Sequence, residues 1–168
     1  KKVPAKYVHN TWDEKTQTAK SEMKSEVLVL SAKELKDICY MIPCPKSPHG
    51  CDVDPTGEYI VGSGKLAALI PVFSFDKLQN AIKNKQFDGE YDGIPVVKYE
   101  AALHGEVQKP GLGPLHTEFD GKGNAYTTFF VSSEVVKWDI KSLKVLDRVP
   151  TYYSVGHLCI PGGDSKKP

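Results

Sequence analysis

Two histidines open matching stretches of this sequence. His49 is followed by a short extended segment, an Asp-x-x-Gly turn at residues 54–57 and a predicted strand. His116, 67 residues later, opens the same series of features, with its turn at residues 120–123. A third histidine, His157, follows 41 residues further on in a similar setting bounded by glycine and proline. The function of the chain therefore depends on whether these three imidazoles meet in space.

Histidines at repeated positions predict a metal site. Imidazole is a borderline ligand that suits copper, zinc, iron and nickel. In a β-propeller, equivalent positions of successive blades point at one axis, so repeated histidines converge there. Asp54 and Asp120 belong to the turns, and no other carboxylate recurs beside the histidines in a ligand pattern. The repeat therefore predicts His49 and His116 as ligands, and it favours copper or zinc over magnesium or calcium.

The other histidines and the cysteines fit no metal-site pattern. His9 and His104 lie outside the repeated stretch, and we expect them to be structural residues. The four cysteines form no Cys-x-x-Cys pair and are too few for a disulfide framework. A zinc site made of Cys44, His49 and Cys51 would lack the usual paired spacing. We therefore expect all four cysteines to be buried free thiols.

Short strands are the elements that must position the histidines. One helix is predicted over residues 77–85, with Asp76 as its N-cap. Residues 1–25 are predicted to be mostly loop, with Tyr7 and Trp12 packed on the body. A polar connector is predicted at residues 86–93 and a long, functional loop at residues 101–114. Strands are predicted at residues 26–31, 38–42, 58–62, 69–75, 94–99, 125–131, 134–140 and 144–149.

Closely spaced short strands with little helix predict an all-β repeat fold. A β-propeller fits best, because residues 27–59 and 125–149 both alternate apolar residues with short turns, as its four-stranded blades do. The chain has room for two to three blades, so we expect residues 1–168 to be a partial propeller domain of a longer protein. An irregular β-sandwich is the alternative.

The composition excludes some partners. An apolar content of 40% and a charged content of 26% are typical of a globular domain. The net charge of +1 gives no electrostatic reason to expect nucleic acid or an anionic membrane as a partner. No apolar run approaches the ~20 residues of a membrane span, and the first residues lack the apolar region of a signal peptide.

The sequence also contains five longer motifs, which are CPKSPHGC at residues 44–51, GSGKL at 62–66, GLGPLHT at 111–117, FDGKGNAYTT at 119–128 and VKW at 136–138. These motifs resemble those of the nitrous oxide reductase family. They occur in the family's order, and the resemblance extends over about residues 20–168. The region of residues 152–161 is similar to the Sec-exported branch of the family.

This resemblance implies a seven-bladed propeller whose hub holds a four-copper, sulfide-bridged cluster bound by seven histidines. By motif, His49, His116 and His157 are the three ligands in this chain, and the other four belong to blades outside it. The resemblance also implies a C-terminal cupredoxin domain with a dinuclear copper site, absent from this chain, and a head-to-tail homodimer.

The reaction that the resemblance implies is the two-electron, two-proton reduction of nitrous oxide to dinitrogen and water in denitrification. The electron donor would be a c-type cytochrome or a cupredoxin, and the location would be the periplasm. Better-studied family members also bind calcium near the hub. The motifs place Lys24 where an aspartate ligand is usual and Ser47 where an asparagine is usual, so we expect the ammonium to repel calcium here.

Three functions are compatible with the residues. The first is copper-dependent nitrous oxide reduction, for which this segment alone, with three of seven ligands, is expected to be inactive. The second is a non-catalytic propeller scaffold whose hub histidines only form hydrogen bonds. The third is a zinc- or calcium-dependent propeller hydrolase, which needs carboxylate or asparagine ligands where this chain has histidine. Convergence of the three histidines would favour the first.

Overall fold

The computed structural model describes residues 3–13, 15–16, 18–29, 32, 35, 37–163 and 165, with the backbone alone for residues 3–13 and 18–29. The chain divides into two compact units. One comprises Lys1–Met41 and Glu90–Pro95, and the other comprises Ile42–Gly89 and Val96–Pro168. All three histidines predicted as ligands belong to the second unit.

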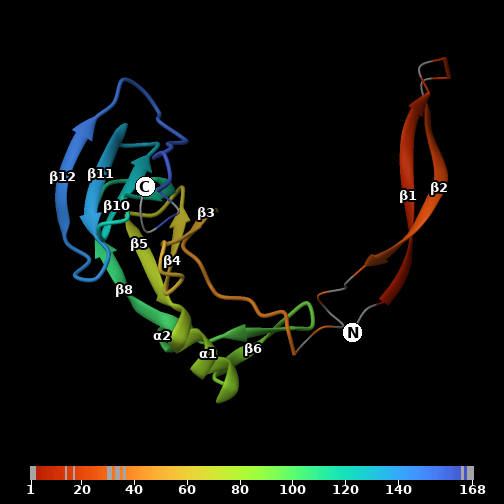
Figure 1. Cartoon of the computed structure of the whole chain (residues 1–168), viewed down its shortest axis with the longest axis horizontal. Coiled ribbons are helices and arrows are strands. Elements are labelled where there is room, and N and C mark those ends of the chain that lie inside the picture. Colours follow the sequence, from red (N-terminus) through yellow and green to blue (C-terminus); the bar gives the residue numbers. More distant parts are fainter. Residues whose placement is uncertain are drawn as a thin grey trace. The chain divides into compact units, whose positions relative to one another are not determined.

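In the first unit, β1 (Val3–Asp13) and β2 (Thr18–Val29) pair as an antiparallel hairpin (Figure 1). The prediction of mostly loop over residues 1–25 is therefore wrong, because ladder hydrogen bonds between two long strands require no apolar period. Residues 26–29 of the strand predicted at residues 26–31 form the end of β2, and residues 30 and 31 lie outside the described part of the structure. The predicted packing of Tyr7 and Trp12 concerns side chains that lie outside the described part of the structure.

The second unit contains two four-stranded antiparallel sheets (Figure 1). The first has the order β3-β4-β5-β8, with β3 (Pro48–Val53), β4 (Tyr59–Gly64), β5 (Leu69–Ser74) and β8 (Leu103–Gln108). The second has the order β12-β11-β10-β9, with β9 (Pro114–Phe119), β10 (Asn124–Phe129), β11 (Glu134–Asp139) and β12 (Val145–Pro150). Strands that follow one another along the chain pair in space, as in propeller blades. The prediction of a partial all-β propeller is confirmed, with two blades.

Most of the predicted blade strands are observed close to their predicted positions. The strands expected at residues 58–62, 69–75, 125–131, 134–140 and 144–149 are β4, β5, β10, β11 and β12, with ends displaced by at most two residues. Alternation explains this success in the second blade. In β11, Val136 and Trp138 are buried while their neighbours are partly exposed, so the side-chain period of two was readable.

An insertion separates β5 from β8. It contains α1 (Phe75–Lys83), β6 (Phe87–Tyr91), β7 (Ile94–Val97) and α2 (Tyr99–Ala102), with β6 and β7 paired. Helix α1 begins two residues before its predicted start, because Ser74, and not Asp76, is its N-cap. The Ser74 hydroxyl accepts a hydrogen bond from Lys77 N at 3.1 Å.

Three local predictions are wrong around this insertion. The connector expected at residues 86–93 contains β6, and the loop expected at residues 101–114 contains β8. Strand β6 is exposed along most of its length, so it carries no apolar alternation. The strand expected at residues 38–42 is not formed. Ile38 ends a turn, in which Ile38 N and Cys39 N donate to Leu35 O at 2.9 and 2.8 Å, and Met41 forms a single β-bridge. A short apolar run in the sequence does not distinguish a strand from a turn.

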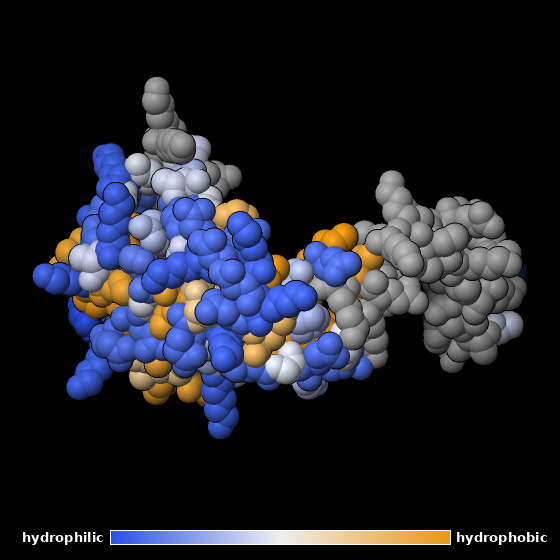
Figure 2. Space-filling view, turned by 90° about the horizontal axis from the view of Figure 1, so that it is seen from below, coloured by the Kyte–Doolittle hydropathy of each residue, from blue (hydrophilic) through white to orange (hydrophobic). Residues whose placement is uncertain are grey.

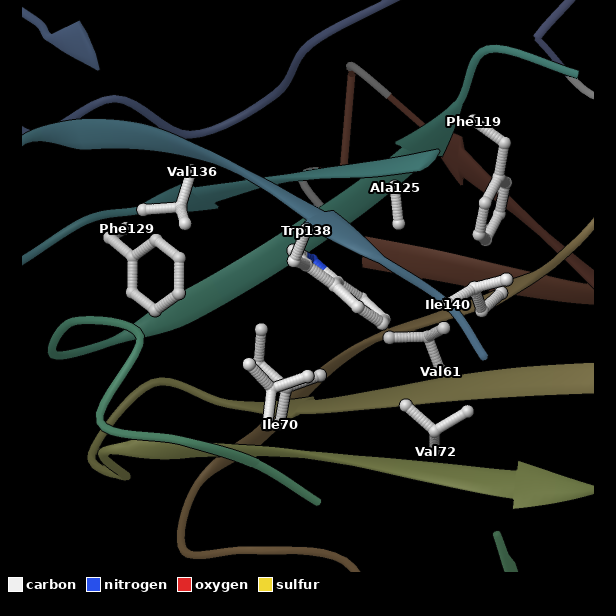
Figure 3. Packing of buried hydrophobic residues seen from close by; sticks show 10 residues of the cluster. Val61, Ile70, Val72, Phe119, Ala125, Phe129, Val136, Trp138 and Ile140 are labelled. Atoms are coloured by element: carbon white, nitrogen blue, oxygen red, sulfur yellow. The ribbon is translucent and has the colours of Figure 1, made fainter. Parts of the chain in front are cut away.

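The core of the second unit joins the two blades. Trp138 and Phe129 of the second sheet face Ile70 and Val61 of the first, as Figure 3 shows, and all four side chains are buried. The Trp138 indole also donates a hydrogen bond to the buried Thr127 hydroxyl at 2.9 Å. The cluster consists of Val61, Ile70, Val72, Val107, Phe119, Ala125, Phe129, Val136, Trp138 and Ile140.

Hydrophilic side chains cover most of the described surface in Figure 2, with apolar residues scattered between them. Such single exposed apolar residues are normal for a folded domain whose larger apolar side chains are buried. Among the residues that the structure describes, no helix has the length and apolar character needed to cross a membrane.

Candidate metal centre

The three histidines predicted as ligands lie close together. His49 is in β3, His116 is in β9 and His157 is in the segment after β12. The ring centroid of His116 is 4.9 Å from that of His49, with an interplanar angle of 66°. It is 4.4 Å from that of His157, with an angle of 24°. One ring thus contacts the other two, although they come from three separate segments.

The repeat seen in the sequence is also a repeat in the structure. In each blade, the strand that carries the histidine leads through an aspartate-bonded turn into the next strand. Asp54 accepts hydrogen bonds from two backbone amides of the first turn, at 3.1 and 2.8 Å. Asp120 does the same in the second turn, at 2.8 and 3.1 Å. His49 and His116 therefore lie on corresponding strands of successive blades, five residues before Asp54 and four residues before Asp120.

A close backbone approach brings the two histidine strands together. Strands β3 and β9 are end strands of their sheets and contact each other. Gly50, the residue after His49, is buried, and a Cβ atom there would overlap the carbonyl oxygen of Leu115. Only glycine permits this approach without displacing one strand. The Pro-His-Gly motif therefore includes its glycine for a packing reason.

His116 is the most enclosed of the three histidines. Its Nε2 atom is buried and has no hydrogen-bond partner among the described residues. Burial lowers the pKa of His116 below its ordinary value, Asp52 opposes this effect, and His157 and His49 add to it. The ring is therefore neutral at pH 7. A neutral imidazole with a buried, unpaired ring nitrogen has the character of a metal ligand.

The arrangement does not suit a single metal ion. Within the described part of the chain, no group of three or more His, Cys, Asp or Glu side chains is placed to hold one ion. The rings of His116 and His157 are nearly parallel. Because the nitrogen lone pairs lie in the ring planes, stacked rings direct them along separate lines. The three imidazoles are thus close to one another without converging on one point.

A buried hydroxyl links two of the histidine segments. Thr128 Oγ1 donates to Gly156 O, beside His157, at 2.5 Å. The same oxygen lies 3.4 Å from the backbone nitrogen of His116. Thr128 is fully buried in β10. Sequence reasoning missed its role, because a threonine in a strand is common and nothing local marks its long-range partner.

The remaining histidines do not join this group. His104 packs edge-on against Tyr59, with ring centroids 4.9 Å apart, and its Nε2 lies 3.1 Å from Lys141 O. It is a structural residue, as predicted. The side chain of His9 lies outside the described residues. So does that of Lys24, and the expectation about calcium at Lys24 and Ser47 stays a prediction.

The cysteine prediction is wrong. Cys44, Cys51 and Cys159 are exposed and Cys39 is partly buried, although all four are free thiols as predicted. Cys51 lies on β3, which is the end strand of its sheet, and Cys44 lies in the segment before it. End strands have no neighbour within the sheet on one side, so a small apolar residue there need not be buried.

A cleft of about 270 Å³ lies elsewhere in the second unit. Its lining includes Asp54, Tyr59, Phe119 and Asn124, which come from the turns and the strand ends next to them. Asp54 follows the last residue of β3, whereas His49 is near the first. The cleft is therefore at the other end of that strand and is separate from the histidines.

The sequence was compared with those of known proteins. No protein-family model matches the chain. It is 36% identical to nitrous-oxide reductase of Stutzerimonas stutzeri over 149 residues, which cover 82% of this chain and 22% of that protein. It is 38% identical to nitrous-oxide reductase of Ralstonia nicotianae (strain ATCC BAA-1114 / GMI1000) over 128 residues, which cover 70% and 18%. The protein from Pseudomonas fluorescens is 40% identical over 99 residues, which cover 59% and 14%.

Two solved structures resemble the fold more distantly. Kuenenia stuttgartiensis hydrazine synthase has a TM-score of 0.46 and 12% sequence identity, and the match covers 64% of this chain and 24% of that chain. Apo AztD from Citrobacter koseri has a TM-score of 0.44 and 12% sequence identity, and the match covers 67% of this chain and 26% of that chain. The chain spans about a fifth or less of the length of the reductases compared above. The sequence resemblance predicted from the motifs is confirmed, because the chain is similar to one segment of several nitrous-oxide reductases.

Proposed function

We propose that this chain is part of a nitrous-oxide reductase and supplies three histidine ligands to its copper centre. The reaction is the reduction of nitrous oxide by two electrons and two protons to dinitrogen and water. The observation that carries the proposal is the contact of the His116 ring with both His49 and His157. The similarity to reductases from three organisms supports the same function.

The donor set fits copper. The three side chains are imidazoles, which bind copper well, and the ring of His116 is neutral with a buried, unpaired nitrogen. Rings that lie close together without meeting at one point suit neighbouring ions of a cluster. We propose that His49, His116 and His157 bind a four-copper, sulfide-bridged cluster together with four histidines outside this chain. When bound, the copper would supply the electrons and the Lewis acidity that nitrous oxide needs.

The protein's own residues prepare the site. The two blades hold His49 and His116 on contacting end strands, so the rings are placed by rigid sheets and not by loops. Burial keeps the ring of His116 unprotonated and therefore available as a ligand. The buried hydroxyl of Thr128 ties Gly156 to the same sheet, which limits where His157 can lie.

We extend the proposal to the whole protein on the same resemblance. It would be a periplasmic homodimer with a seven-bladed propeller and a C-terminal cupredoxin domain that carries a dinuclear copper site. A c-type cytochrome or a cupredoxin would donate the electrons. Calcium would not bind beside Lys24. With only three of seven cluster ligands, the 168-residue chain alone would be inactive.

The test compares two histidine substitutions in the complete reductase. His116→Ala removes the shared ring, and His104→Ala removes a structural histidine that packs against Tyr59. We expect His116→Ala to lower bound copper and nitrous oxide consumption, measured with a reduced viologen as electron donor, by at least about 100-fold, because a ligand is lost. His104→Ala should retain copper and activity within a few-fold.

The same comparison distinguishes the proposed function from the alternatives. If wild-type protein binds no copper and both variants behave alike, the histidines form only structural contacts and the domain is a non-catalytic propeller scaffold. If His116→Ala keeps its copper and its activity, the assignment of His116 as a ligand is wrong.

A further inference from the structure

The backbone on both sides of His116 is bound by side chains of the other blade. Thr117 N donates a hydrogen bond to Asp52 Oδ2 at 2.8 Å. The hydroxyl of Ser63 donates to Leu115 O at 2.5 Å. Asp52 lies on β3 and Ser63 on β4, in the blade that carries the first histidine. The second histidine is thus placed by residues outside its own sheet.

Ser63 also binds the backbone beside His49. Its Oγ atom accepts a hydrogen bond from Gly50 N at 2.7 Å, and only 2% of the side chain is exposed. One hydroxyl therefore connects the residue after His49 to the residue before His116. The Oγ atom accepts from Gly50 N and also carries the proton that it donates to Leu115 O, so only a side chain with a hydroxyl or thiol at this atom could make both contacts.

We propose that Ser63 and Asp52 are positioning residues that keep the rings of His49 and His116 in register across the two blades. The position of a histidine ring depends on the position of its Cα atom. The two peptide groups on either side of the His116 Cα atom are both hydrogen-bonded to the first blade. The loss of either contact would let β9 shift against β3 and would change the 4.9 Å ring spacing. The consequence for copper rests on the proposed function, whereas the register itself does not.

Three substitutions in the complete protein test this role. Asp52→Ala removes the acceptor of Thr117 N, Asp52→Asn keeps an oxygen that can accept, and Ser63→Ala removes the bridging hydroxyl. Two matched controls remove local contacts. Asp147→Ala removes a carboxylate that accepts from the adjacent Arg148 N, and Ser142→Ala removes a hydroxyl that donates to Asp139 within an exposed turn. The two controls remove the same types of side chain as Asp52→Ala and Ser63→Ala.

The first readout is amide hydrogen exchange in copper-free protein. We expect exchange at Thr117 to be at least about tenfold faster in Asp52→Ala, and exchange at Gly50 to rise similarly in Ser63→Ala, because each amide loses its acceptor. Asp52→Asn and both controls should match the wild type. Unchanged exchange at both sites would overturn the proposal, whatever the protein does with copper.

The second readout is copper retention against a competing chelator. Loss of groups that orient metal ligands typically weakens metal binding by about 10–100-fold, and we expect that range for Asp52→Ala and Ser63→Ala, with recovery in Asp52→Asn. Faster exchange with unchanged copper retention would mean that the contacts do not position the ligands. If the wild type binds no copper, the proposed function fails, and the exchange readout alone then decides whether the register depends on these residues.

Discussion

The ring of His116 stacks on the ring of His157, with centroids 4.4 Å apart and planes inclined by 24°. Three strands separate these residues along the chain, so the contact is a property of the folded blade. Two imidazolium ions would repel each other at this distance, which is why His157 contributes to the lowered pKa of His116. The stack therefore favours the neutral form of the His116 ring.

Thr128 should control the segment that carries His157. In Thr128→Val the shape is kept but the hydrogen bond to Gly156 O is lost. Leaving a partly buried carbonyl unpaired costs about 1–3 kcal/mol, which we expect as a lower free energy of unfolding in urea. Thr128→Ser keeps the hydroxyl and should recover most of this loss. Equal effects of the two substitutions would contradict this role of the hydrogen bond, because only Thr128→Ser keeps the hydroxyl.

Gly50 should tolerate no side chain. In Gly50→Ala the new Cβ atom would overlap Leu115 O, so β3 and β9 must separate. We expect roughly 2–4 kcal/mol of destabilisation, measured by thermal or urea unfolding. Gly57→Ala is the matched control, since its Cβ atom meets nothing within 4 Å and its cost, about 1–2 kcal/mol, arises only from φ of +79°. A cost for Gly50→Ala no larger than this would contradict the close approach.

Trp138 should dominate the stability of the second blade. Trp138→Phe leaves a smaller ring in a fully buried position and removes the 2.9 Å hydrogen bond to Thr127. Together these losses should cost about 2–3 kcal/mol of unfolding free energy. Tyr152→Phe, at a fully exposed aromatic residue, should stay within about 0.5 kcal/mol of wild type. The comparison can be read from unfolding curves followed by far-ultraviolet circular dichroism.

Asp120 should make stability depend on pH in the acidic range. Burial raises its pKa, but hydrogen bonds from the Asn124 side chain and from two backbone amides outweigh this and lower the pKa below its ordinary value. A carboxyl with a lowered folded-state pKa stabilises the fold above its unfolded value of about 3.9, and the contribution is lost as pH falls through the folded value.

Asp120→Asn tests this dependence. At pH 7 the variant should be less stable than the wild type by about 1 kcal/mol. The Asn124 side chain donates to Asp120 Oδ2, and in the variant an amide N–H replaces this accepting oxygen. The difference from wild type should shrink as pH falls below about 4. Asp147→Asn, on the exposed strand β12, is the control and should show little difference at either pH. A constant difference for Asp120→Asn down to pH 2 would contradict the linkage.

Local pattern was sufficient where a strand has one buried face. β11 and β5 were predicted to within one residue at each end, because their apolar residues and turn signals are contiguous in the sequence. β6 and the β1–β2 hairpin were missed, since neither shows an apolar alternation and their pairing is made by backbone hydrogen bonds. The exposure of Cys51 was also mispredicted, because whether a residue lies on an end strand depends on strand order.

The sequence by itself determined that His49 and His116 lie on corresponding strands, since each strand leads through an Asp-x-x-Gly turn into the next strand of its blade. Only the tertiary structure decided the contacts that place the rings. Ser63 and Leu115 are 52 residues apart, and Asp52 and Thr117 are 65 apart. A hydroxyl or carboxylate carries no local sign of such a partner, because the hydrogen bond exists only after two blades have packed.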